Sequence, residues 1–121
     1  MSEPLVLIVA AGFAAMGLAA LVRPREVLAQ FGVATDTIEG RNEVRAVYGG
    51  FGIAVAALLA VAALGEPATG EGIVVAIAVA LIGMAAGRLV SAGFELPQSL
   101  YPVWVYFVIE VVGSATLLIA V

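Results

Sequence analysis

The sequence contains no cysteine, no histidine and no lysine among its 121 residues. Without cysteine the chain cannot form disulfides, thiolate nucleophiles or cysteine-based metal sites. Without histidine it lacks the commonest metal ligand and the usual proton shuttle near neutral pH, and without lysine it cannot form a Schiff base. No spacing typical of paired catalytic carboxylates or of a triad stands out. We therefore expect no metal site and no catalytic site.

Charge is also scarce. Only 12% of the residues are charged and 64% are apolar even without glycine, whereas about 25% are charged in ordinary soluble domains. The mean hydropathy is +1.18. So few charges could not cover a soluble domain, which excludes a soluble globular domain, a disordered chain, a nucleic-acid binder and a secreted disulfide scaffold. An integral membrane protein is the class that fits.

Four long apolar runs divide the chain. We expect helices over residues 4–22, 41–64, 71–92 and 100–121, each on the order of 20 residues, which matches a bilayer core at about 1.5 Å per residue. Between the first two runs, a segment that begins at Pro24 and ends at Gly32 predicts a short interfacial helix over residues 24–32. The predicted fold is therefore all-α: one transmembrane domain over residues 1–121, built as a four-helix membrane bundle with a short interfacial helix after the first span.

The basic residues predict how the bundle is oriented. All five are arginines, and they lie toward one side of the four spans: Arg23, Arg25, Arg41, Arg45 and Arg88. The positive-inside rule places the connections 23–40 and 93–99 in the cytoplasm. We therefore expect a multi-pass protein of the inner (plasma) membrane with both termini outside the cytoplasm.

Charged side chains inside a span need a reason, because one at the helix centre costs about 2.5–3.5 kcal/mol on insertion scales. Glu110 is expected about nine residues into the fourth helix, or about 13 Å deep and near mid-bilayer. Three helices supply polar residues to the same half of the bundle. We predict that they form an intramembrane polar or ligand-binding cluster of Glu43, Arg45, Tyr48, Arg88, Ser91 and Glu110.

Two interpretations of this cluster stay open. The charges could pair with one another and only set the register of the helices. Alternatively, they could form a buried polar site that binds a head group or relays a proton.

Glycines suggest where the helices approach closely. Gly83 and Gly87 form a GxxxG pair in the third helix, and Gly49, Gly50 and Gly52 thin the second helix where it is crossed or leave space for a ligand. Small-residue faces of this kind lead us to expect that the chain packs against copies of itself or against other membrane subunits.

A family resemblance supports this interpretation. The segments Phe31-Gly32-Val33 and Gly40-Arg41-Asn42-Glu43-Val44-Arg45-Ala46-Val47-Tyr48-Gly49-Gly50, then Gly87-Arg88-Leu89-Val90-Ser91, Pro97 and Glu110, resemble the pattern of uncharacterised bacterial four-span membrane proteins of the DoxX/DoxD-like group. The likeness covers nearly the whole chain, although that family often has Asp-Gly before the last proline, where this chain has Phe94-Glu95-Leu96. The resemblance implies four helices, highlights Glu43, Arg45, Arg88 and Glu110, and implies no reaction. No cofactor is identified.

Three functions follow, in order of preference. The first is a small non-enzymatic membrane protein that binds a lipid-, quinone- or pigment-like molecule in the bilayer, or serves as an accessory subunit of a larger complex. The second is a small proton-coupled transporter that uses Glu110 and Arg88 and works as an oligomer, because four spans are too few for alternating access alone. A membrane enzyme with Glu43 or Glu110 as acid or base ranks last.

Overall fold

A computed structural model describes all residues from 1 to 121, and 82% of them are helical with none in a strand. Four stretches are long and apolar enough to cross a membrane, so the expected all-α bundle is confirmed. The elements in chain order are α1 (Glu3–Val22), α2 (Pro24–Ala29), α3 (Ile38–Val44), the π-helix η1 (Arg45–Gly50), α4 (Phe51–Leu64), α5 (Pro67–Phe94) and α6 (Val103–Ala120). The second span consists of α3, η1 and α4 without a break.

Several helix ends differ from the expected positions for local reasons. The second span begins at Ile38 rather than residue 41, because Thr37 caps it and its hydroxyl accepts a hydrogen bond from the Gly40 N–H at 2.9 Å. The third begins at Pro67 rather than residue 71, since proline fits the first turn of a helix. The last helix begins only at Val103, so it is three residues shorter at this end than expected.

The two helices of the first half are in direct backbone contact. A Cβ atom added to Gly17 of α1 would lie 2.8 Å from both the Gly49 carbonyl oxygen and the Ile53 amide nitrogen of the second span. Gly52 lies equally close to the backbone of α1. The π-helical turn η1, which sequence patterns did not predict, occupies the same stretch of the second span. A residue with a Cβ atom at these positions would push α1 and the second span apart.

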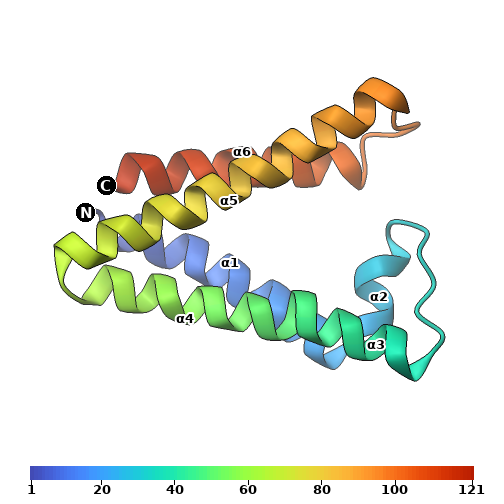
Figure 1. Ribbon diagram of the computed structural model, residues 1–121, viewed down its shortest axis with the longest axis horizontal. Coiled ribbons are helices and arrows are strands. Elements are labelled where there is room, and N and C mark those ends of the chain that lie inside the picture. Colours follow the sequence, from blue (N-terminus) through green and yellow to red (C-terminus); the bar gives the residue numbers. More distant parts are fainter.

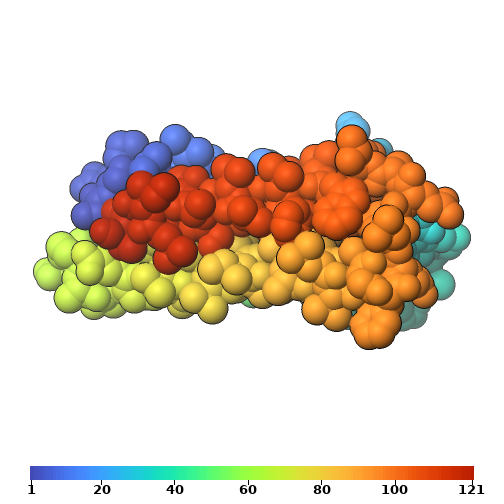
Figure 2. Space-filling model, turned by 90° about the horizontal axis from the view of Figure 1, so that it is seen from above, coloured from blue at the N-terminus to red at the C-terminus, as the bar shows by residue number.

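The four spans form two pairs. In Figure 1, α1 runs beside α4, and α5 runs beside α6. The pairs converge at the end that holds both termini and the turn between α4 and α5, and they spread apart toward the other end, where α2 lies. Figure 2 shows α5 and α6 side by side along the length of the elongated molecule.

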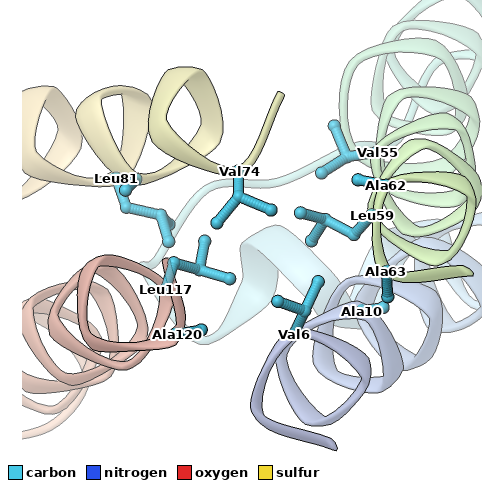
Figure 3. Close-up of a cluster of buried hydrophobic side chains, with 11 residues drawn as sticks. Val6, Ala10, Val55, Leu59, Ala62, Ala63, Val74, Leu81, Leu117 and Ala120 are labelled. Carbon is cyan, nitrogen blue, oxygen red and sulfur yellow. The ribbon is translucent and has the colours of Figure 1, made fainter. Parts of the chain in front are cut away.

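The buried core lies toward the converged end. Figure 3 shows side chains from all four spans pointing toward one another there, including the fully buried Val6, Leu59, Val74 and Leu117. The Ser2 N–H donates to the Ala120 carbonyl oxygen at 2.6 Å and joins the two ends of the chain. Toward the spread end, polar and aromatic contacts connect the segment after α2 to the last helix and its preceding turn.

Candidate functional site

A largely buried ion pair joins α5 to α6. Arg88 Nε donates to both carboxylate oxygens of Glu110 at 2.9 Å, and Arg88 Nη2 donates to Oε1 at 2.7 Å. The Glu110 side chain is only 5% exposed, while the Arg88 side chain is 23% exposed. The turn of residues 95–102 makes α5 and α6 antiparallel, which brings these two residues to the same level. An ion pair with this geometry neutralises both charges in a medium that disfavours either one alone.

Two aromatic rings flank the Arg88 guanidinium. Its Cζ atom lies 5.9 Å from the centre of the Phe31 ring and 5.7 Å from that of Tyr106. The two rings are themselves 5.4 Å apart. Cation–π contacts of this kind stabilise a guanidinium that has lost part of its water.

Gln30, at the end of α2, ties the first connection to the last helix. Its Oε1 accepts a hydrogen bond from the Tyr106 hydroxyl at 2.8 Å and another from the Tyr101 hydroxyl at 2.5 Å. Its Nε2 donates to the Val27 carbonyl oxygen, so the amide is held at both ends. The segment around α2 is therefore attached to α6 and the turn before it, next to the ion pair, although Gln30 is more than 70 residues from both tyrosines in sequence.

The charges of the second span take no part in this arrangement. Arg45 Nε donates instead to the Leu21 carbonyl oxygen at 3.0 Å, which satisfies an unpaired acceptor at the end of α1. Glu43 and Tyr48 are exposed, and neither makes a side-chain hydrogen bond or ion pair. Of the four predicted charges, the structure brings together Arg88 and Glu110, because the helix pairs spread apart at the end where the second span carries Glu43 and Arg45.

Glu110 and Arg88 lie at different places along their helices. Since α6 begins at Val103 rather than at residue 100, Glu110 lies seven residues from the helix start, or about 10 Å along the axis. Arg88 lies six residues before the end of α5, or about 9 Å. Glu110 is thus near the middle of the 18-residue α6, ten residues from its end, whereas Arg88 lies in the last quarter of the 28-residue α5.

The five glycines expected to pack helices have different surroundings. Gly49 and Gly52 lie at the crossing with α1, and a Cβ on either would clash with it. Gly50 would meet only the Arg45 carbonyl oxygen, at 3.8 Å. A Cβ added to Gly83 or Gly87 would meet no atom within 4 Å, so neither residue packs against another helix of this chain.

A shallow depression of about 370 Å³ borders the ion pair. We call it the Arg88 depression, and it is lined by Met84, Gly87, Arg88, Ser91, Pro97 and Val103. Glu110 engages Nε and Nη2 of the guanidinium, while Nη1 makes no hydrogen bond within the protein and is not sealed from the outside. The Ser91 hydroxyl, one turn along α5, has no hydrogen-bond partner either. The depression thus combines free hydrogen-bond donors with an apolar wall.

Sequence reasoning missed Gln30 and Tyr101 as parts of this site. A single amide at the end of a six-residue helix carries no pattern that distinguishes it from a solvated side chain. The sequence does indicate that Tyr106 lies near Glu110, because the two are four residues apart and so share one face of α6. Its link to Gln30 depends on tertiary structure alone.

Comparison with known proteins places the chain in a family. No curated protein matches it, and no solved structure matches it. The likeness to the DoxX/DoxD-like group therefore stays a prediction. One family model matches residues 2–121, which is the whole chain apart from its first residue. The chain, with its four apolar helices and its Arg88–Glu110 pair, belongs to the family of DUF4345, a domain of unknown function.

Proposed function

We propose that this protein is a multi-pass membrane protein that binds an amphiphilic molecule in the Arg88 depression. The observation that carries the proposal is Nη1 of Arg88, which makes no hydrogen bond and lies in a depression lined in part by the apolar Met84 and Val103. Four helices long and apolar enough to cross a membrane supply the setting. No catalytic residue is required.

Unsatisfied donors explain why a ligand is expected there. In hydrocarbon, a polar group without a hydrogen-bond partner is strongly disfavoured, because no water is available to replace one. Glu110 leaves Arg88 Nη1 without a partner, and Ser91 lacks one too. An oxygen atom of a bound molecule would satisfy these donors, while Met84 and Val103 offer apolar contact to the rest of it.

The same geometry speaks against Glu110 as a proton carrier. Both of its carboxylate oxygens accept hydrogen bonds from Arg88, and no other side chain bonds to it. A carboxylate that shuttles protons passes them to a neighbouring group, and the one side chain bonded to Glu110 is an arginine, which keeps its protons. Binding is therefore favoured over the alternative of proton-coupled transport through Glu110 and Arg88.

A pair of matched variants tests the proposal. Gly87→Leu fills the Arg88 depression, and Gly83→Leu adds the same side chain one turn away, where it does not line the depression. Neither residue has an atom within 4 Å of its added Cβ, so both variants are expected to fold with wild-type helix content by circular dichroism.

The measurement is native mass spectrometry of protein extracted in polymer-bounded membrane discs. We expect a stoichiometric small molecule on the wild type and on Gly83→Leu, and its loss from Gly87→Leu. Equal, non-stoichiometric generic lipid on all three proteins would refute the proposal. A membrane subunit that copurifies in place of a small molecule would favour the accessory role instead.

A further inference from the structure

The charge balance at Arg88 restricts what kind of molecule could bind beside it. Glu110 lies within 2.9 Å of the guanidinium and is nearly buried, so the pair carries no net charge. No other acidic or basic side chain forms an ion pair with either residue. An anionic ligand would gain less attraction than at an unpaired arginine, because the Glu110 carboxylate on the far side of the same guanidinium repels it. An anion would also lose its hydration in surroundings of low dielectric, a cost that an uncharged ligand does not have.

The donors that Arg88 retains suit an uncharged acceptor. A guanidinium has five N–H groups, and Glu110 accepts from the Nε–H and from one of the two N–H groups of Nη2. The N–H groups that are left, together with the Ser91 hydroxyl, can donate to oxygen atoms that carry no formal charge. A carbonyl oxygen is the simplest such acceptor.

The depth of the pair points the same way. With 28 residues, α5 is about 42 Å long, close to the full thickness of a bilayer, of which about 30 Å is hydrocarbon. Arg88 lies about 9 Å from the end of α5, and Glu110 lies about 10 Å from the start of α6. Both residues therefore fall within the hydrocarbon core when α5 and α6 span the bilayer. Phosphate groups lie farther out, in the interfacial layer.

We infer that the Arg88 depression recognises an uncharged amphiphile through a carbonyl oxygen, which accepts hydrogen bonds from Arg88 and Ser91 while its apolar part lies against Met84 and Val103. This inference rests on the proposed binding function and names the ligand class. The carbonyl could belong to an acyl ester or to a quinoid ring, which present the same chemistry to Arg88.

The test uses the full chain in nanodiscs of phosphatidylcholine, titrated with three probes. Dioctanoylglycerol carries uncharged ester carbonyls, decylubiquinone carries uncharged ring carbonyls, and dioctanoyl phosphatidylglycerol carries an anionic head group. Binding to the wild type, Gly87→Leu and Gly83→Leu is measured by native mass spectrometry at low and high salt.

We expect at least one uncharged probe to bind the wild type about tenfold more tightly than the anionic probe. Its affinity should be the same at both salt concentrations, unchanged in Gly83→Leu and lost in Gly87→Leu. The two uncharged probes then distinguish an ester from a quinoid ligand. Tighter binding of phosphatidylglycerol that Gly87→Leu abolishes would overturn the inference and leave the proposed function standing. If no probe distinguishes Gly87→Leu from Gly83→Leu, the proposed binding site itself is refuted.

Discussion

Replacement of Arg88 by Met is expected to destabilise the bundle more than replacement of Glu110 by Leu. Either change leaves a charged group without its partner. The Glu110 side chain is only 5% exposed, so an unpaired carboxylate there would have no water and no other donor. Arg88 is 23% exposed and lies near the end of α5, so its long side chain can bend toward the interface when Glu110 is absent.

The expected magnitudes follow from burial and contacts. Removal of one partner of a buried pair costs about 3–5 kcal/mol in the free energy of unfolding. Arg88→Met should fall at the upper end of that range, because it also removes contacts with two aromatic rings that are each about 0.5–1 kcal/mol or more. Glu110→Leu should fall at or below the lower end, at about 2–3 kcal/mol. The double variant should recover most of the loss, since an apolar pair replaces an ion pair at little net cost.

The free energy of unfolding is measured by titration with sodium dodecyl sulfate in mixed micelles. Circular dichroism follows the helices, and the fluorescence of Trp104, the single tryptophan, follows α6 near the site. A double-mutant cycle should give a coupling energy of at least about 2 kcal/mol. The reasoning would be wrong if the two single effects simply added, or if Glu110→Leu were the more damaging change.

Three further predictions concern other parts of the molecule. Gly17→Leu should lower the free energy of unfolding by about 1–3 kcal/mol or more through overpacking against backbone atoms, whereas Gly12→Leu, whose Cβ would meet nothing, should have little effect in the same titration. Gln30→Leu removes the acceptor of two tyrosine hydroxyls and should lower the free energy of unfolding by about 1–2 kcal/mol. Amide hydrogen exchange should accelerate in the segment around α2. Unchanged exchange there would count against the attachment of this segment through Gln30. Because the chain has no cysteine, single cysteines at Thr69 and Gln98 can report orientation: an impermeant thiol reagent outside intact cells should label the first and spare the second, and the reverse pattern would invert the expected orientation.

The helices themselves could be predicted from local sequence. Apolar runs of bilayer length predict spans because backbone groups in lipid must be paired within the segment. Start signals act over a few residues, and the earlier start of the second span still depends on a local cap, Thr37. The π-helical turn η1 is different: it lies where α1 crosses, and no local pattern distinguished it from α-helix.

The candidate site could be predicted only in part. Intramembrane charge pointed to Arg88 and Glu110 because a charge in a span must be compensated. The same reasoning also selected Glu43 and Arg45, which sequence alone could not separate from the first two. Arg45 donates instead to the Leu21 carbonyl oxygen at the end of α1. Any arginine near a helix end can bond such an acceptor, so the sequence does not single it out.

Composition and local pattern thus determined the class of protein, its four spans and the side on which its arginines lie, since each depends on residues close together in sequence. Tertiary structure decided which charges pair, how closely α1 and the second span approach, and that Gln30 reaches the tyrosines of the last helix and its preceding turn. The first and third outcomes depend on how far the two helix pairs spread apart, and the second depends on the glycines that face each other within one pair. The pairs converge only at the opposite end of the bundle, where side chains from all four spans pack together.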